Sequence, residues 1–320
     1  MSSPRVSIGM PLYNSQRYLS EAFDSLLSQD YKDVEIVVSD NASTDRTWEI
    51  CQRYARADGR VRLHRNEVNM GAAHNYNRTV TLARGEMFKW AAYDDICAPT
   101  LVRRCVEALD EAGPSAVLAY PRTILIDDDG AELGLYRDGV NLRSRRPYLR
   151  VATLAGNLSL CNAVMGVIRT NALRRTGLIR PQISSDVTLL AELATLGEFC
   201  EVEEDLFFRR IHTGSSRQGS TTDLGTIALW FDTRKPGRNK RPKAHIVLNA
   251  TNALLRADVP TRDRLSCAVA FATVWSARNA HIRGSHAKRR LRALLSSSQD
   301  ESDSRPYINR GRLGERTEET

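Results

Sequence analysis

Apolar and polar positions alternate along the first 120 residues in a way that indicates repeated strand and helix units. Short apolar runs typical of buried strands occur at about residues 5–10, 34–39, 61–64, 87–92 and 116–121. Apolar residues recur at helical spacing between them, at about residues 17–29, 45–57, 72–83 and 100–112. Strands that alternate with helices form a mainly parallel sheet covered by helices, so we expect an α/β fold.

The pattern is less regular after residue 122. Residues 158–169 have the composition of a strand, and Gly166 within it suggests close approach of the backbone to a ligand. A helix is expected from Asp186 through Leu196, with Gly197 as its C′ residue. The acidic segment 127–130 reads Asp-Asp-Asp-Gly between apolar runs, which is typical of a tight turn rather than a metal site.

The composition of the chain changes after residue 217. A polar linker is expected at 218–222 and a basic loop at 233–243, followed by two amphipathic helices at about 244–257 and 261–295. The residues from 296 onward are rich in serine and charge, so we expect a disordered tail. The predicted parts are therefore residues 1–217, a basic helical region at 218–295 and a tail at 296–320.

Positive charge is concentrated near the C-terminus. The net charge is +8, but residues 230–292 hold 15 Lys and Arg against 3 Asp and no Glu, which leaves the remainder at −4. A basic region on an otherwise acidic protein suggests an anionic partner, either lipid head groups or a phosphorylated acceptor. We do not expect a nucleic-acid partner, because no recognisable nucleic-acid module accompanies the charge.

Three further features of the sequence bear on its location. The first expected strand begins by about residue 5, which leaves no room for a secretory leader, so we expect a cytoplasmic protein. The longest apolar stretch, 265–277, is 13 residues, whereas a spanning helix needs about 20. The cysteines are scattered without a C-x-x-C pair and are expected to be reduced packing residues: Cys51, Cys97, Cys105, Cys161, Cys200 and Cys267.

Polar residues follow several of the expected strands, at the edge where open α/β sheets bind ligands. The strand at 5–10 leads into Pro11-Leu12-Tyr13-Asn14, and the strand at 34–39 leads into Asp40. The adjacent carboxylates of Asp94 and Asp95 follow the strand at 87–92. Vicinal carboxylates at such an edge suggest a divalent metal, Mg²⁺ or Mn²⁺, that holds a phosphorylated ligand. The sequence therefore predicts a nucleotide site.

Four short motifs occur in a fixed order: Pro11-Leu12-Tyr13-Asn14, residues 39–45, Asn69-Met70-Gly71 and Tyr93-Asp94-Asp95. In their order and spacing the chain resembles, over residues 4–217, the inverting family 2 glycosyltransferases of the GT-A fold. Downstream, Ser185-Asp186 and Arg209-Arg210-Ile211-His212 stand where that family has its base and its C-terminal histidine. The resemblance implies a GT-A type α/β/α sandwich with a nucleotide-binding half at about 1–122 and an acceptor half at about 123–217.

The resemblance assigns nucleotide-sugar contacts to residues of the first half. Asp40 would accept the imide N–H of uracil or thymine, and Tyr13, which follows Pro11 in the same motif, would stack on the base. Asn69 and Gly71 would form a turn that lines the nucleotide-sugar pocket. Each has a plainer alternative, namely an Asx-turn or helix cap for Asp40, a core tyrosine for Tyr13 and an ordinary tight turn for Asn69 and Gly71.

A carboxylate in the same region has a structural interpretation instead. Asp45 is expected to cap the helix that begins near it rather than to contact a ligand.

The resemblance also implies a metal site. Asp94 would be a direct ligand, Asp95 a ligand or its support, and His212 would help to hold the metal from the C-terminal side. The alternatives are that the aspartates cap the helix after Pro99 and that His212 is an ordinary surface or core histidine. Either Arg210 or its neighbour Arg209 would neutralise the departing diphosphate.

Asp186 is the expected catalytic base. Direct displacement at the anomeric carbon needs a group that takes the proton from the attacking hydroxyl, and Ser185-Asp186 matches the family's acidic motif. The alternative is a carboxylate that merely stabilises a helix N-terminus.

Two positions depart from the common family pattern. Tyr76 precedes Asn77 where the family usually has an arginine, so another residue must supply that positive charge. Ala92 stands at the first aspartate of the family's D-x-D-D motif. The later aspartates match the metal-ligand end of the motif.

The expected function is therefore metal-dependent, hexosyltransferase-like transfer of a sugar from a UDP or TDP sugar to an acceptor hydroxyl. The basic C-terminus suits a saccharide or lipid-linked acceptor, as in the synthesis of envelope polysaccharide or glycolipid. It also suits peripheral contact with anionic lipid on the inner face of the cell membrane. A non-catalytic sugar-nucleotide-binding protein is one alternative, which the missing first aspartate favours. A nucleotidyltransferase is the other, but the segment 11–15 lacks the glycine-rich basic loop that it needs.

Overall fold

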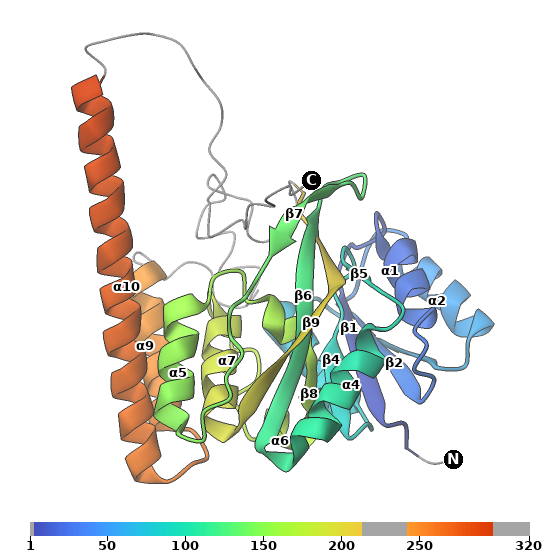
Figure 1. Cartoon of the computed structure of the whole chain (residues 1–320). Helices are drawn as coiled ribbons and strands as arrows, with labels where there is room; N and C mark the ends of the chain where they lie inside the picture. The colour runs from blue at the N-terminus through green and yellow to red at the C-terminus, as the bar shows by residue number, and fades with distance from the viewer. Residues whose placement is uncertain (1–2, 213–241, 297–320) are drawn as a thin grey trace, which may run out of the picture.

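A twisted sheet of nine strands forms the centre of the molecule in the computed structural model, which describes residues 3–212 and 242–296 (Figure 1). The strand order is β3-β2-β1-β4-β8-β6-β9-β5, and β7 pairs with β6 outside this path. The strands are β1 (Val6–Leu12), β2 (Val34–Asp40), β3 (Val61–Arg65), β4 (Met87–Trp90), β5 (Ile96–Cys97), β6 (Ala116–Ile126), β7 (Glu132–Tyr136), β8 (Val167–Arg169) and β9 (Glu198–Arg210).

Helices cover both faces of this sheet. One apolar core lies between the sheet and α1, α2 and α4, and a second lies between the opposite face and α3, α5, α6, α7, α9 and α10. The helices are α1 (Leu19–Leu27), α2 (Thr47–Ala57), α3 (Ala72–Leu82), α4 (Leu101–Ala112), α5 (Pro147–Asn157), α6 (Thr170–Arg174), α7 (Ser185–Leu196), α9 (Pro242–Leu255) and α10 (Thr261–Ser296). The expected α/β/α sandwich is confirmed.

Strand alternation explains how the two cores form. In β4, Met87 belongs to the core beneath α1 and α4, whereas Phe88 and Trp90 belong to the core on the opposite face. Strands β3, β2, β1 and β4 run parallel, so their carboxyl ends reach the same edge of the sheet. The register that pairs Leu12 with Asp40 brings the ends of β1 and β2 together there.

The segment 158–169 differs from the expected continuous strand. Cys161 has a φ of 61°, a 3₁₀ helix follows at Asn162–Met165, and strand structure is limited to β8. The expected close approach at Gly166 is present, but its neighbour is β6: a Cβ at this position would lie 2.3 Å from the Ala119 carbonyl oxygen. This packing accounts for the glycine without a ligand.

Gly197 also has a different role from the expected one. Its φ of −171° is extended, so the residue does not form a left-handed helix cap. A Cβ there would lie 2.4 Å from Cγ1 of Val117 and 2.6 Å from the carbonyl oxygen of Ser115. The glycine is therefore required by the tight passage of β9 beside β6.

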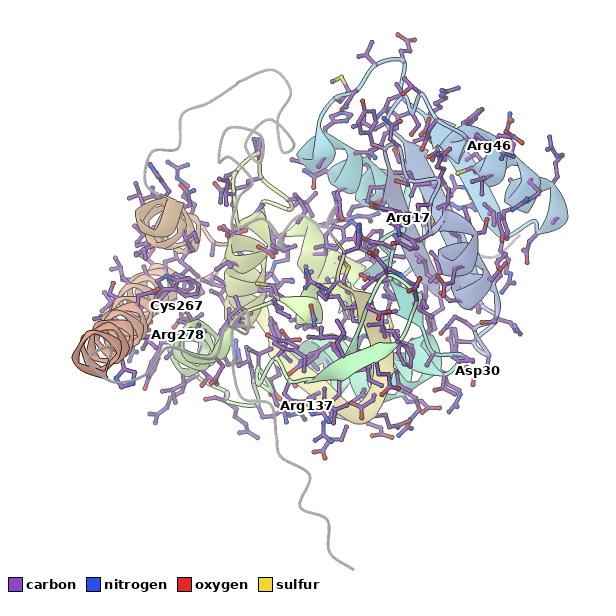
Figure 2. All side chains as sticks on the ribbon, turned by 90° about the horizontal axis from the view of Figure 1, so that it is seen from above. Arg17, Asp30, Arg46, Arg137, Cys267 and Arg278 are labelled. Atoms are coloured by element: carbon purple, nitrogen blue, oxygen red, sulfur yellow. The ribbon has the colours of Figure 1, made fainter. Side chains whose placement is uncertain are left out.

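The C-terminal helices pack on the α/β domain. Cys267 and Phe271 are buried in the core shared with α5 and α7, and Figure 2 shows Cys267 and Arg278 on the side of α10 that faces α5. Arg278 donates a hydrogen bond to the carbonyl oxygen of Leu158 at the end of α5. By contrast, Leu265 and Val269 are 55% and 65% exposed.

Several expectations concern parts of the chain outside this description. The linker at 218–222, most of the loop at 233–243 and nearly all of the tail at 296–320 lie outside the described residues. In the described part of the chain, no helix is long and apolar enough to span a bilayer. All six cysteines are buried, as expected for packing residues.

Candidate functional site

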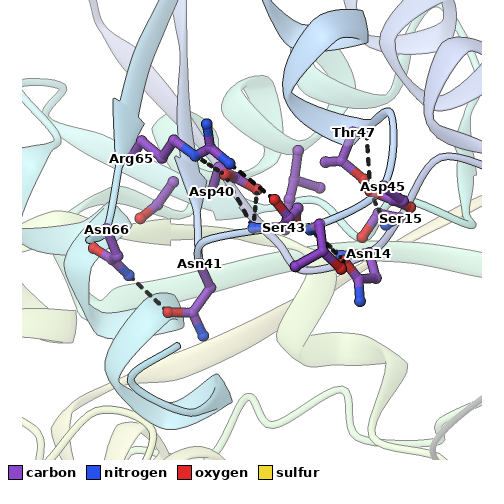
Figure 3. Close-up of polar contacts among 12 residues, drawn as sticks. Asn14, Ser15, Asp40, Asn41, Ser43, Asp45, Thr47, Arg65 and Asn66 are labelled. Carbon is purple, nitrogen blue, oxygen red and sulfur yellow. Dashed lines mark hydrogen bonds and ion pairs between the residues drawn. The ribbon is translucent and has the colours of Figure 1, made fainter. Parts of the chain in front are cut away.

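Asp40, the last residue of β2, is fully buried and held by several polar contacts (Figure 3). Nε of Arg65 lies 3.0 Å from Oδ2 of Asp40, and the backbone N–H of Ser43 donates to both carboxylate oxygens at 3.3 and 3.4 Å. The turn contact that was the alternative to base binding is therefore present. Arg65 in addition balances the charge of the buried carboxylate.

The Asn69-Met70-Gly71 turn is fastened to the residue after β2. Asn41 Nδ2 donates to Asn69 Oδ1 at 2.8 Å, and Asn41 Oδ1 accepts the N–H of Met70 at 2.9 Å. Gly71 has a φ of +83°, which favours glycine, and its N–H donates to Asn69 Oδ1. A tight turn is thus present, and it lies at the same strand ends as Asp40.

Tyr13 extends from the end of β1, the strand in which Pro11 lies beside Ser39 of β2. Tyr13 is 44% exposed, so it does not lie within the apolar core. Asp45 Oδ1 accepts the N–H of Thr47 at the start of α2. Arg46 is the N-cap of α2, so Asp45 precedes the cap and binds the first N–H of the helix from there.

Asp94 and His212 meet across the sheet edge. Nε2 of His212 lies 2.9 Å from Oδ2 of Asp94, and the His212 side chain is 4% exposed. Asp95 beside them is buried, and its Oδ1 accepts the backbone N–H of Arg210 at 3.0 Å. Burial, together with the negative charge of Asp94, raises the pKa of Asp95 to about 7.

The residues of this cluster supply some, but not all, of the ligands that a metal ion needs. In the described part of the chain, no three His, Cys, Asp or Glu side chains are grouped to hold an ion. Asp94 and His212 nevertheless bring a carboxylate oxygen and an imidazole nitrogen together, a donor pair that suits Mn²⁺. Hard divalent cations are often bound by one or two protein ligands plus substrate phosphates, and this pair is sufficient for that arrangement.

Arg210 links three segments around the aspartates. Its guanidinium is 2% exposed and forms an ion pair of 2.6 Å with Glu21 of α1. It also donates to the carbonyl oxygens of Asp94, Asp127 and Asp128, each at 3.0 Å. These contacts occupy the guanidinium, so in this structure Arg210 positions the Asp94 loop and is not open to a ligand.

Tyr18 is a member of the cluster that sequence reasoning missed. It donates a hydrogen bond to Asp128, its ring centroid lies 5.2 Å from that of His212, and the Arg210 guanidinium lies 4.5 Å above the ring. The contact at Asp128 comes from the β6–β7 turn, which is the tight turn expected at 127–130. No local sequence signal connects that turn to Tyr18.

Asp186 lies in the first turn of α7, and its Oδ1 accepts the N–H of Val187 at 2.9 Å. The loop before it is held by Asn77 of α3, which exchanges two hydrogen bonds with the backbone of Ile179 at 2.9 and 3.0 Å. Ser184 then enters the helix with a φ of 59°. The position of Asp186 therefore depends on α3 as well as on its own helix.

The expected metal ligands and the expected base act electrostatically on one side chain, that of Tyr76 in α3. Burial raises the pKa of the Tyr76 phenol. The negative charges of Asp94, Asp95 and Asp186 raise this pKa further, so all three carboxylates are in electrostatic range of one side chain. Carboxylates that are about 90 residues apart in sequence thus act on the same phenol.

Comparisons with known proteins agree with this arrangement. Residues 7–180 match the model of Glycosyl transferase family 2. The chain is 32% identical over 116 residues to glycosyltransferase GlyG of Streptococcus pneumoniae, an alignment that covers 36% of this chain and 38% of GlyG. It is 35% identical over 111 residues to the putative glycosyltransferase EpsE of Bacillus subtilis, with 34% and 40% covered. The matched part is thus about two fifths of each relative.

Solved structures share the fold at low sequence identity. Residues 1–349 of S. aureus TarS in complex with UDP superpose with a TM-score of 0.60 and 15% identity, over 83% of this chain and 70% of that one. The mannosyltransferase PcManGT from Pyrobaculum calidifontis, in complex with GDP-Man and Mn²⁺, gives a TM-score of 0.50 at 16% identity, over 92% and 81%. Since the family model spans more than half of the chain and the sandwich superposes on glycosyltransferases of the GT-A fold, this protein belongs to glycosyl transferase family 2.

Proposed function

We propose that this protein transfers a sugar from a nucleoside diphosphate sugar to an acceptor hydroxyl with inversion at the anomeric carbon. The observation that carries the proposal is the Asp94–His212 pair, whose atoms lie 2.9 Å apart, with Asp94 and Asp186 both acting electrostatically on Tyr76. TarS in complex with UDP-GlcNAc and PcManGT in complex with GDP-Man support a nucleotide-sugar donor. A protein that only bound the donor would have no use for a carboxylate placed like Asp186.

In the proposed reaction, the acceptor oxygen bonds to the anomeric carbon as the bond from that carbon to the diphosphate oxygen breaks. Asp186 takes the proton of the acceptor hydroxyl, and the diphosphate leaves with the electron pair. Asp94 and His212, supported by Asp95, would hold Mg²⁺ or Mn²⁺, which stabilises the charge of the leaving group. Asn77 keeps Asp186 in place through its contacts with the preceding loop.

Measurements of ligand binding and of turnover distinguish this proposal from the two alternative functions. A thermal-shift panel of UDP, TDP and GDP with and without Mn²⁺ tests binding, because a ligand at 100 times its dissociation constant stabilises by about 2.7 kcal/mol. Release of UDP from UDP-sugars, with and without acceptors, then tests turnover. Binding without any metal-dependent turnover would favour a non-catalytic protein, and release of pyrophosphate from nucleoside triphosphates would favour a nucleotidyltransferase.

The proposed donor carries uracil or thymine, with Asp40 as the acceptor for its imide N–H and Tyr13 as the stacking ring. Asp40→Ala is expected to weaken UDP about 10- to 100-fold, as for one hydrogen bond to a charged group. Arg65→Gln is the matched variant, because it removes the partner of the Asp40 carboxylate and keeps the carboxylate itself. Equal UDP affinity in Asp40→Ala and wild type would leave Asp40 with its turn role alone.

The proposed acceptor is a saccharide or a lipid-linked saccharide, reached from the cytoplasmic face of the cell membrane. The exposed Leu265 and Val269 on α10 support peripheral contact, together with the basic composition of residues 230–292. Sedimentation with phosphatidylglycerol vesicles at low and high salt tests it. The contact requires binding that weakens with salt and falls in Leu265→Ser/Val269→Ser, whereas absence of binding would contradict it.

A further inference from the structure

The loop between α6 and α7 leads directly to Asp186, and its backbone is unfavourable at two positions. Leu178 and Ser184 have φ values of 53° and 59°, in the left-handed region that residues with a side chain seldom adopt. Such a conformation persists only where neighbouring groups hold it. The contacts of residues 175–184 therefore determine how firmly the start of α7 is placed.

Glu192 of α7 holds this loop through three hydrogen bonds. Nη1 and Nη2 of Arg180 donate to its two carboxylate oxygens at 2.9 and 2.7 Å, and the Gly177 N–H donates to Oε2 at 3.1 Å. Only 6% of the Glu192 side chain is exposed. A carboxylate buried to this degree needs a paired charge and hydrogen bonds, and the loop supplies both.

Gly177 makes room for this pair. A Cβ at position 177 would lie 2.1 Å from Nη2 of Arg180. The guanidinium is held by both oxygens of Glu192, so it could not move aside without losing the pair. The glycine and the ion pair therefore form one arrangement.

Arg180 connects the pair to the start of α7. Its backbone N–H donates to Oγ of Ser185 at 2.5 Å, and Ser185, which precedes Asp186, is fully buried. Asn77 of α3 binds the backbone of the adjacent Ile179. Two helices thus fix neighbouring residues of the loop just before the chain reaches Asp186.

Glu192 is not itself placed as a second base. It lies six residues after Asp186 in α7, so the two side chains leave the helix in directions about 120° apart. Its oxygens are engaged by Arg180 and Gly177. An effect of Glu192 on the reaction must therefore pass through the loop.

We propose that the Arg180–Glu192 pair positions Asp186 for proton transfer, so that both of its members are positioning residues of the reaction. The inference rests on the proposed function, in which Asp186 is the base. Misplacement of a catalytic group by about 1 Å can reduce a rate about 100-fold. Glu192→Gln removes the charge of the pair with little change in size, while the strand ends that carry Asp40 and Asp94 are unaltered.

Release of UDP from UDP-glucose, UDP-galactose and UDP-GlcNAc by the full chain in Mn²⁺, with water as acceptor, tests the assignment. Glu192→Gln is expected to lower kcat about 10- to 100-fold and to leave the affinity for UDP within about threefold. Arg180→Lys keeps the charge but not the planar fork, and it is expected to retain more turnover than Glu192→Gln. Glu198→Gln is the matched control, because it breaks the ion pair with Arg143 and leaves the loop intact, and it is expected to keep the wild-type kcat.

A double variant separates positioning from general damage to the fold. Adding Glu192→Gln to Asp186→Asn is expected to change turnover less than about twofold, because residues that act as a unit are not additive. If the pair only stabilised the protein, Glu192→Gln would lower turnover by the same factor in both backgrounds, and that result would overturn the inference. Wild-type kcat in Glu192→Gln would overturn it as well.

Two further outcomes have distinct meanings. If Glu192→Gln does not fold, as measured by thermal denaturation, the same cycle is carried out with Arg180→Lys and is read in the same way. Unaltered turnover in Asp186→Asn would refute the assignment of the base, and this inference with it. A wild-type protein that bound no UDP and released none from these sugars would refute the proposed function itself.

Discussion

Nε2 of His212 lies 2.9 Å from Oδ2 of Asp94, although the two residues are 118 positions apart in sequence. The antiparallel pairing of Ile96 in β5 with Phe208 in β9 brings the end of β9 back to the loop that carries Asp94. The backbone N–H of Arg210 is bonded to Asp95 in the same place. The end of β9 thus completes a cluster that begins after β4.

This pairing leads to a prediction about metal dependence. Chelation is expected to abolish the thermal shift that UDP produces, because Asp94 and His212 contact the diphosphate through a divalent ion in the proposed site. Asp94→Asn is expected to lose UDP binding and turnover together. Asp129→Asn, at an exposed aspartate of the β6–β7 turn, is the control and is expected to behave as the wild type. UDP binding of equal strength in chelator would show that the metal assignment is wrong.

Asp186→Asn is predicted to separate chemistry from donor binding. Asparagine keeps an oxygen that can accept the Val187 N–H, but it cannot take a proton from the acceptor, so turnover is expected to fall about 10²- to 10⁴-fold. Donor affinity is expected to stay within a factor of about three, because the residue does not contact the diphosphate in the proposed arrangement.

The other carboxylates in the same segment are already paired with arginines, which makes the Asp186→Asn variant easier to interpret. Glu192 is 2.7 Å from Arg180 and Glu198 is 3.3 Å from Arg143, so both are engaged in ion pairs. Retention of more than about a tenth of wild-type turnover in Asp186→Asn would mean that another base serves the reaction. Poor folding of the variant, measured by thermal denaturation, would instead favour a capping role.

Arg210→Gln is predicted to destabilise the fold. The change removes the guanidinium that donates to the part-buried carbonyl oxygens of Asp94, Asp127 and Asp128, and we expect a loss of about 2–4 kcal/mol in the free energy of unfolding. Arg17→Gln is the matched comparison, because its side chain is 60% exposed and its pair with Asp128 is worth less than about 1 kcal/mol. Urea denaturation measures both variants, and equal stability would contradict the positioning role.

Asp138 is predicted to make stability depend on pH. Burial raises the pKa of this carboxyl to about 7 in the folded chain, whereas an unfolded aspartate titrates near its ordinary value of 3.8. Between these values the unfolded state releases the proton and the folded state keeps it, so the group reduces stability as pH rises from about 4 to about 7. Above that range the penalty is constant.

Asp138→Asn tests this prediction, since asparagine can still accept the N–H of Asn162 and does not ionise. The melting temperature of the variant relative to the wild type is expected to rise between pH 5 and pH 8. A difference that stayed constant across this range would contradict a raised pKa at Asp138.

Local sequence patterns predicted the architecture well, and for a physical reason. The boundaries of β1 to β4 and of α1 to α4 follow from runs of apolar residues, helical spacing and turn-forming residues, which act over a few positions. The contact of Asp45 with the first N–H of α2 and the turn at residues 127–130 are equally local, and both are present. Short motifs with fixed spacing were sufficient to identify the family.

The tertiary structure decided which side chains share a site. Gly166 and Gly197 are required by close packing against β6, and that neighbour is not encoded near either glycine in sequence. Arg209 and Arg210 look equivalent in sequence, yet strand alternation directs one to the Asn162 segment and the other to Glu21 of α1. Periodicity reports which face of an element is apolar, but only the packing of the whole chain determines which residues meet there.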